Sequence, residues 1–337
     1  MWRLFLIALI AALPAARPAA AQILPQFCQE LVGDFCVSHA REEFPLNDFE
    51  TASIDLADIL SGGPRRDGIP PIDRPQFVGI SELEGLSDTE PVVGLTVGGE
   101  WKAYPLQVLM WHEIANDEIG GVPVAVTFCP LCNAVIVFDR RAVGRTLDFG
   151  TTGRLRNSDL LMYDRQTETW WQQFLGEAIV GELTGTRLDI LPARLESFAE
   201  FRDRAPADAQ VLVPADRRFR AYGANPYEFY DTMPRPFLYR GEVPDGIAPL
   251  ARVVSLSDRA RAWSMDLLRE QGRITAPDGT VLTWRPGQNS ALDAPEISDG
   301  RDVGTVTATR DGQDVPYFVD FAFAFHAFHP QAEILTP

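Results

Sequence analysis

Two cysteines, Cys129 and Cys132, lie between two runs of strand-forming residues, and no other pattern constrains the fold of this chain as strongly. Residues 124–128 and 134–138 consist almost entirely of Val, Ile, Thr, Phe and Ala. Val, Ile, Thr and Phe favour strands, whereas the proline inside the pair and the asparagine after it favour a turn. The sequence therefore predicts that the two thiols lie at the tip between two strands.

The spacing of this pair limits its chemistry. A Cys-x-x-Cys pair can share one metal ion or close one small disulfide. A thioredoxin-type motif places its first cysteine at the N-terminus of a helix, which lowers the pKa of the thiol. Residues 134–138 are a poor start for a helix, so the sequence favours a metal site or a fixed disulfide over a thioredoxin.

Residues 1–21 have the pattern of a signal peptide. Arg3 gives a short basic start, residues 4–13 are apolar, and Ala19 and Ala21 form a small-x-small cleavage site. Residues 4–13 are too few to span a bilayer, and no later stretch is long and apolar enough. We expect an exported, soluble, periplasmic protein without a stable membrane span, whose mature chain begins at Gln22.

The formal net charge is −17 at pH 7, and hydrophobic residues make up 46% of the chain. An acidic chain repels nucleic acid and anionic lipid, so nucleic acid is not expected as a partner. The apolar content is typical of a packed globular protein. The composition identifies no small-molecule or protein partner.

The four cysteines form two close pairs. Cys28 and Cys36 lie in residues 22–45, and an oxidising compartment favours a structural disulfide between them. Residues 46–337 are predicted to form a single β-rich domain. Because short helical patterns interrupt the strand patterns, the predicted fold class is α+β, a β-rich mixed fold with short helices. The aromatic run 317–325 alternates with a period of two and predicts a buried strand.

Two parts of this domain, about residues 90–190 and 250–337, resemble each other faintly. Residues 92–109 and 253–268 both suggest a strand and then a short helix, and a glycine turn and another strand follow each. This pattern indicates an internal duplication of a strand-helix-turn-strand unit. Few positions match, so chance similarity is the alternative.

Three of the four histidines are candidate metal ligands. Neutral imidazole and thiolate are ligands that zinc and copper prefer. Cys129, Cys132, His112 and His329 would together make a four-ligand zinc site, or a copper site if one position stays open. His326 lies close to His329 in sequence and is predicted to neighbour the site. The alternative is that these imidazoles pack in the core or make structural hydrogen bonds.

Polar residues close to these positions predict the wall of a pocket. His112 and Asn116 are four apart and would share one face of a helix, and Glu113 would orient an imidazole. The other residues predicted to line the site are Asp117, Asn157, Asp159, Tyr163, Asp164 and Arg165. The alternative is that these groups form ordinary turns and structural hydrogen bonds.

Several motifs together resemble a prokaryotic family known as domain of unknown function 3179. They are residues 112–117, 127–133, 138–140, 157–167 and 327–330, and the resemblance covers most of the chain after residue 50. The family pattern has glycine after the second cysteine, where this chain has Asn133, which tolerates the left-handed backbone region. The resemblance supports the choice of site and implies no activity or cofactor.

Three functions remain open from the sequence. The first is an exported protein that binds copper or zinc through the cysteine pair. The second is a thiol–disulfide protein in which Cys129 attacks and Cys132 resolves. The third is a scaffold or interaction protein in which the pair is only a structural cross-link.

Overall fold

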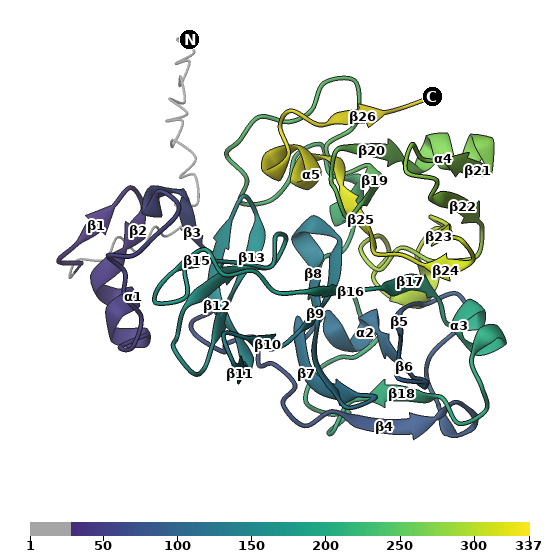
Figure 1. Ribbon diagram of the computed structural model, residues 1–337, viewed down its shortest axis with the longest axis horizontal. Helices are drawn as coiled ribbons and strands as arrows, with labels where there is room; N and C mark the ends of the chain where they lie inside the picture. The colour runs from purple at the N-terminus through teal and green to yellow at the C-terminus, as the bar shows by residue number, and fades with distance from the viewer. Residues whose placement is uncertain (1–27) are drawn as a thin grey trace, which may run out of the picture.

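The computed structural model describes residues 28–337, and within them five sheets form the blades of a β-propeller (Figure 1). Each blade has four or five strands. Neighbouring strands within the blades are antiparallel, except that β18 pairs in parallel with β6 and β26 in parallel with β20. A small antiparallel hairpin, β1 (Leu31–Val32) and β2 (Phe35–Cys36), lies before the blades.

The blades combine strands that are distant in sequence. The first contains β3 (Ile59–Ser61), β12 (Phe149–Arg156), β13 (Asp159–Asp164), β14 (Trp170–Gln172) and β15 (Glu177–Val180). The second contains β7 (Ile114–Ile119), β8 (Val122–Cys129), β9 (Ala134–Asp139) and β16 (Ile190–Leu191). The third contains β4 (Gln76–Gly79), β5 (Pro91–Val97), β6 (Glu100–Pro105), β17 (Ala193–Ser197) and β18 (Gln210–Val213).

The C-terminal part of the chain forms the last two blades. The fourth contains β19 (Arg252–Leu256), β20 (Arg261–Ser264), β25 (Tyr317–Phe321) and β26 (Glu333–Leu335). The fifth contains β21 (Arg273–Thr275), β22 (Val281–Arg285), β23 (Thr305–Arg310) and β24 (Gln313–Asp314). A second small hairpin, β10 (Arg141–Ala142) and β11 (Arg145–Thr146), projects from the end of β9.

The helices are short and do not form a layer. They are α1 (Val37–Glu43), α2 (Leu106–Leu109), α3 (Phe198–Arg204), α4 (Met265–Gln271) and α5 (Ala322–Phe328). All five begin directly after a strand, and for α2 to α5 that strand belongs to a blade. In the described part of the chain no helix has the length and apolar character needed to cross a membrane.

The predicted α+β fold class is therefore wrong, because the architecture is a β-propeller with a few short helices. What recurs is a sheet and not a strand-helix-turn-strand unit. The third blade contains the order β17-β5-β6-β18, followed by β4, and the fourth has the order β25-β19-β20-β26. In both, three antiparallel strands are followed by a strand that pairs in parallel, β18 or β26. The sequence pattern detected a strand followed by a helix in each of these two blades. Local periodicity does not show which strands pair to form a sheet.

The prediction of one buried strand over residues 317–325 is also only half right. Strand β25 ends at Phe321, and α5 begins at Ala322. All nine residues are buried, so the alternation of phenylalanine and alanine does not reflect two different faces. Alanine has the highest helix propensity, which favours a helix once the strand has ended.

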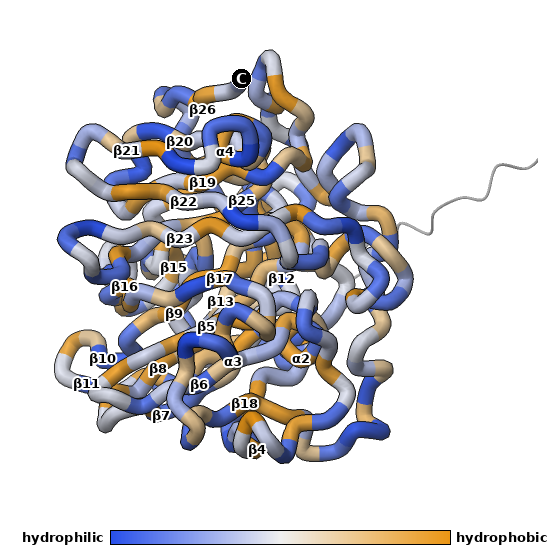
Figure 2. Tube along the Cα trace, turned by 90° about the vertical axis from the view of Figure 1, so that its right-hand side faces the viewer, coloured by the Kyte–Doolittle hydropathy of each residue, from blue (hydrophilic) through white to orange (hydrophobic). Residues whose placement is uncertain are grey.

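One apolar core contains residues from all five blades, among them Val93, Val126, Met162, Val254 and Leu282. Figure 2 shows the same arrangement along the chain, with apolar segments on the strands and hydrophilic ones mainly in the connecting loops. Burial of this surface supplies the main driving force for folding. The core fixes the strands that carry the cysteine pair.

The N-terminal segment packs on the outside of the first blade. The predicted disulfide between Cys28 and Cys36 is confirmed, with a Cα–Cα distance of 5.9 Å. Phe35 and Phe44 make edge contacts with the ring of Trp170, with centroid distances of 5.8 and 5.1 Å. The predicted signal peptide, residues 1–21, and the first part of the predicted segment 22–45 lie outside the described residues.

Candidate functional site

The cysteine pair lies at the tip between β8 and β9, as the sequence predicts. A short 3-10 turn, Pro130–Cys132, joins the two strands, and Asn133 ends it in the left-handed conformation with φ of 53°. Asparagine adopts this conformation more readily than most residues. The side-chain Nδ2 of Asn133 also donates to the carbonyl of Val319 at 2.9 Å, which fixes the tip against the fourth blade.

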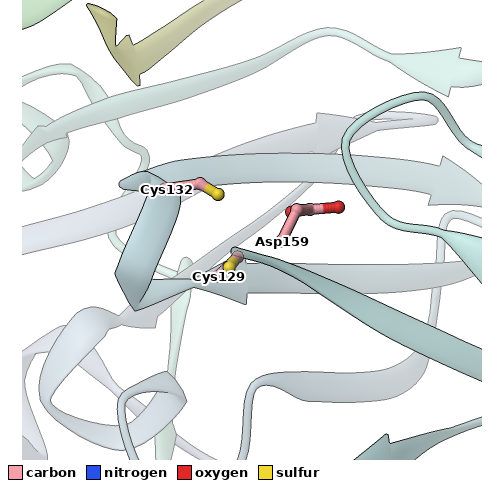
Figure 3. Close-up of side chains that lie close together, drawn as sticks. All are labelled: Cys129, Cys132 and Asp159. Carbon is pink, nitrogen blue, oxygen red and sulfur yellow. The ribbon is translucent and has the colours of Figure 1, made fainter. Parts of the chain in front are cut away.

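A third group from the first blade completes the cluster. Asn157 and Ser158 have positive φ values of 53° and 65° and form the turn from β12 into β13, so Asp159 begins β13 beside the cysteines. One ligand atom each of Cys129, Cys132 and Asp159 lies within 4.8 Å of the others (Figure 3). The Cys129 Sγ also contacts the carbonyl of Ser158 at 3.8 Å.

The two oxygens of Asp159 have different surroundings. Its Oδ2 accepts from Nε2 of Gln172 at 2.6 Å and from the backbone N–H of Phe174 at 2.9 Å. Its Oδ1 is buried and has no hydrogen-bond partner among the described residues. Burial raises the pKa of Asp159 to about 7, although the hydrogen bonds from Gln172 and Phe174 oppose this rise. The two hydrogen bonds to Oδ2 therefore fix the orientation of the carboxyl, while Oδ1 accepts no hydrogen bond from the described residues.

A second buried carboxyl, Glu113, lies next to the cluster. It follows α2, has a φ of 59°, and its carbonyl accepts from the N–H of Phe128 at 2.8 Å, one residue before Cys129. Burial, and then the nearby Asp159, raise the pKa of Glu113 to about 8. No cation forms an ion pair with it in residues 28–337.

The two thiols are free and almost completely enclosed. Cys129 is 2% exposed and Cys132 is 0% exposed. Burial raises the pKa of both thiols, and the neighbouring Asp159 raises them further. In the absence of a cation the thiols are therefore protonated, because buried negative charges repel one another and lack water.

A loop segment, residues 230–237, covers the hairpin tip. The sequence gave little reason to connect this segment with the site. Tyr230 donates its hydroxyl to the carbonyl of Leu131, between the two cysteines, at 3.0 Å. The same hydroxyl accepts from the N–H of Phe237 at 3.3 Å, and Ser158 donates to the Phe237 carbonyl at 2.5 Å. Only the tyrosine-rich composition of residues 205–250 could have pointed to this role.

A buried ion pair, Asp320 with Arg259, also adjoins the cluster. The guanidinium of Arg259 lies 3.5 Å from the ring centroid of Phe318 and 4.6 Å from that of Phe174. Its positive charge acts on Asp159, and the Asp320 carboxylate acts on both Asp159 and Cys132. Sequence reasoning missed this pair, although a single aspartate inside the apolar run 317–325 was a signal for it.

The histidines do not join the cysteines. Both ring nitrogens of His112 are engaged, Nδ1 with the carbonyl of Pro70 at 2.7 Å and Nε2 with the Tyr222 hydroxyl at 2.8 Å. His329 packs against aromatic rings, and burial lowers its pKa to about 4. His326 lies partly exposed on α5. Within the described residues the only third member of the cysteine cluster is a carboxylate.

The predicted helical face shared by His112 and Asn116 does not exist, because α2 ends at Leu109 and β7 begins at Ile114. Asn116 instead bonds Asp73 at 2.9 Å and both backbone groups of Phe149. The positive φ of Glu113 turns the chain between the helix and the strand, which the periodicity of the sequence does not reveal.

The other predicted pocket residues make structural contacts. Asp117 accepts from Lys102 and Tyr104, and Tyr163 donates to Asp67 at 2.7 Å. Asp164 accepts from the Thr167 N–H and the Trp171 indole at 2.7 and 2.9 Å, and Arg165 pairs with Asp73 on the surface. Asn157 supplies a turn residue. Of the predicted pocket residues, Asp159 and Glu113 lie at the cysteine pair.

Fold and site together define a β-propeller with an enclosed cluster of two thiols and a carboxyl at one hairpin tip. The chain belongs to the family described as "Protein of unknown function (DUF3179)", whose model matches residues 66–332 and so includes the whole cluster. The resemblance seen in the sequence is thereby confirmed. No curated protein and no solved structure matches the chain.

Proposed function

We propose that the protein binds one transition-metal ion, zinc in preference to copper, through Cys129, Cys132 and Asp159. The observation that carries the proposal is the approach of two sulfurs and one carboxylate oxygen to within 4.8 Å of one another. Ligands bonded to one tetrahedral zinc ion at about 2.0–2.3 Å lie roughly 3.5 Å from one another. Small rotations of these three side chains therefore suffice to bring their ligand atoms onto one ion.

The unpartnered oxygen of Asp159 supports this assignment. A buried acceptor without a donor costs about 1–3 kcal/mol, so such atoms are rare unless something else satisfies them. The Oδ1 of Asp159 is such an atom, while Gln172 and Phe174 hold Oδ2. Hydrogen bonds of this kind orient a metal-ligating carboxylate and raise the affinity of the site.

The electrostatics of the cluster also favour a cation. Burial raises the pKa of Cys129, Cys132 and Asp159, because their anionic forms lose water and repel one another. A divalent ion reverses this balance, since it stabilises deprotonated thiols and carboxylates directly. Arg259, whose charge acts on Asp159, is itself paired with Asp320, so this ion pair adds no net charge beside the cluster.

The donor set distinguishes zinc from copper. Zinc accepts thiolate and carboxylate ligands together and is usually four-coordinate. Copper(I) prefers soft sulfur ligands, so the carboxylate contributes less to a copper site. With three protein ligands one position stays open, and Glu113 is a further buried carboxyl whose charge acts on Cys129.

A thiol–disulfide function is the second candidate, because both thiols are free, adjacent and close to a buried acid. Asp159, whose pKa burial raises to about 7, could accept the proton of an attacking Cys129 thiol. Against this, Cys129 is 2% exposed, and burial raises rather than lowers the pKa of its thiol. A partner disulfide would reach the sulfur only after the segment around Tyr230 had moved.

The test is metal analysis of protein purified without chelator under anaerobic conditions, followed by zinc and copper(I) titration of the metal-free form. We expect one bound equivalent, its loss in Cys129→Ser and Cys132→Ser, and weakening of at least tenfold in Asp159→Asn. Asp164→Asn is the matched control, because Asp164 is an equally buried carboxyl at the other end of β13. It should keep the full equivalent.

Two outcomes would count against a metal site. Wild-type protein that takes up neither ion, with thiols that react equally fast before and after chelation, would refute it. Metal-free protein that cycles between dithiol and disulfide with a defined reduction potential would favour the second candidate instead.

A further inference from the structure

A cavity of about 560 Å³ is lined in part by residues 231–233, which directly follow Tyr230 in the segment that covers the cysteines. Its walls come from the loop before β19, from β20 and α4, and from the fifth blade. The volume falls within the range of small-molecule binding sites, roughly 300–1,000 Å³. None of the residues assigned above to the metal site lines it.

An ionic network around Asp231, the residue after Tyr230, forms part of the cavity wall. The Asp231 carboxylate accepts from Arg252 at 2.9 Å, from Arg301 at 2.7 Å and from the hydroxyl of Ser290. Arg252 also donates to Ser290 at 2.7 Å and is 8% exposed. Asp231 is thus fully engaged, and the network holds two guanidinium groups in place.

The guanidinium groups of Arg301 and Arg269 at the cavity keep N–H donors that are free to bind a ligand. Arg301 uses Nη1 for Asp231 and for Asp293, and its side chain is 42% exposed. Arg269 uses one Nη2 for Asp266, and its side chain is 60% exposed. The other guanidinium N–H groups of these two arginines have no acceptor among residues 28–337.

The carboxylates at the cavity are better satisfied than the arginines. Asp302 accepts from the N–H groups of Gly287 and Gly304, at 3.0 and 2.9 Å. Asp266 is paired with Arg269 at 2.9 Å. Free guanidinium donors suit carboxylate and phosphate oxygens, which they bind in pairs.

Apart from the hydroxyls of Thr232 and Ser264, the rest of the lining is apolar. Trp284, Met265 and Leu250 face the same cavity as the arginines. An aromatic ring and a thioether are adaptable surfaces for a planar or aliphatic group. The cavity thus combines guanidinium N–H donors with an apolar side, which is the usual design of a small-molecule site.

We propose that this cavity binds an organic anion, with its carboxylate or phosphate group at Arg269 and Arg301 and its apolar body against Trp284 and Met265. The inference is independent of the metal site, because it uses different residues and different chemistry. It assigns the protein a ligand-binding role in addition to the cysteine cluster.

The experiment is fluorescence titration of the whole protein with anilinonaphthalene sulfonate, an aromatic anion, and competition with phenyl phosphate and with benzylamine. We expect saturation at one site and displacement by phenyl phosphate but not by the cationic benzylamine. Arg269→Gln should weaken binding about tenfold, which is the usual effect of losing one charge-assisted hydrogen bond.

Two further variants localise the site. Ala248 is an exposed residue on the cavity wall, so Ala248→Trp should fill the opening and abolish saturable binding without disturbing the core. Arg310→Gln is the matched control for Arg269→Gln. Arg310 ends β23 in the fifth blade, its side chain is 48% exposed, and it pairs with Asp278 and does not line the cavity. Unsaturable binding, or binding that Ala248→Trp and Arg269→Gln leave unchanged in proteins with wild-type circular dichroism, would overturn the proposal.

Discussion

Replacing Asp159 by asparagine should stabilise the metal-free protein at neutral and alkaline pH, although the residue lies in the candidate site. Its side chain is 0% exposed, and burial raises its pKa from the ordinary 3.8 to about 7. The folded state therefore binds this proton more tightly than the unfolded state does. Stability is fully retained below pH 4 and falls as the pH rises towards 7, where the folded protein must ionise the group.

The size of the effect follows from the two pKa values. Since each pKa unit corresponds to about 1.4 kcal/mol, a change from 3.8 to about 7 amounts to about 4 kcal/mol at most. Asparagine keeps one oxygen to accept from Gln172 and Phe174 and carries no charge. We expect Asp159→Asn to be more stable than wild type by about 2–4 kcal/mol at pH 8 and nearly equal at pH 4.

The assay is urea and thermal unfolding of metal-free protein at pH 4, 6, 7 and 8 in the presence of chelator. A gain of this size raises the melting temperature by roughly 5 °C or more in a chain this long. A smaller decline with pH should persist in the variant, because Glu113, whose pKa burial raises to about 8, remains. One equivalent of zinc should reverse the order of the two proteins, since zinc stabilises wild type through binding.

The matched control, Asp164→Asn, should change the stability of the protein in the opposite direction. Both oxygens of Asp164 accept hydrogen bonds, from Thr167 and from the Trp171 indole, so Asp164→Asn leaves a buried donor without an acceptor. It should destabilise the protein by about 1–3 kcal/mol. If Asp159→Asn destabilised metal-free protein to a similar extent at pH 8, the argument that Asp159 is a buried carboxyl without a counter-ion would be refuted.

Three further expectations concern the surroundings of the site. Tyr230→Phe should cost about 1 kcal/mol and speed alkylation of the thiols, as measured by mass spectrometry, because it removes the bond to the Leu131 carbonyl; unchanged alkylation would show that this segment is no barrier. Arg259→Met should lower the free energy of unfolding in urea by about 3–5 kcal/mol, because it leaves the buried charge of Asp320 unpaired. The double variant Arg259→Met with Asp320→Leu should recover most of this stability, because it removes both charges. His112→Gln should leave bound zinc at one equivalent by metal analysis, because the imidazole bonds Pro70 and Tyr222; loss of the metal would return His112 to the ligand set.

The sequence predicts best where neighbouring residues determine the outcome. The hairpin tip at Cys129 and Cys132, its left-handed Asn133 and the disulfide near the N-terminus all depend on residues a few positions apart. The sequence also predicts Asp159 among the polar residues that line the pocket at the cysteines. It does not predict that Asp159 is the third member of the cluster, because thirty positions of chain separate it from Cys129.

Errors occurred where two local signals had equal strength or where partners are distant. The aromatic run that begins at Tyr317 is compatible with a strand and with a helix. In the folded protein its first part is strand β25 and its second part is helix α5. The histidines attracted attention because they are rare, yet the ring nitrogens of His112 bond Pro70 and Tyr222, and the ring of His329 packs against aromatic rings. Residue type indicates which groups can bind a metal and does not indicate which of them meet.

By itself the sequence determined that two thiols occupy a tight turn between apolar strands, because turn chemistry and strand periodicity act over a few residues. Only the tertiary structure decided that a carboxyl from another blade, rather than an imidazole, approaches those thiols. A propeller pairs strands from distant parts of the chain, and the burial of one shared apolar core selects that arrangement.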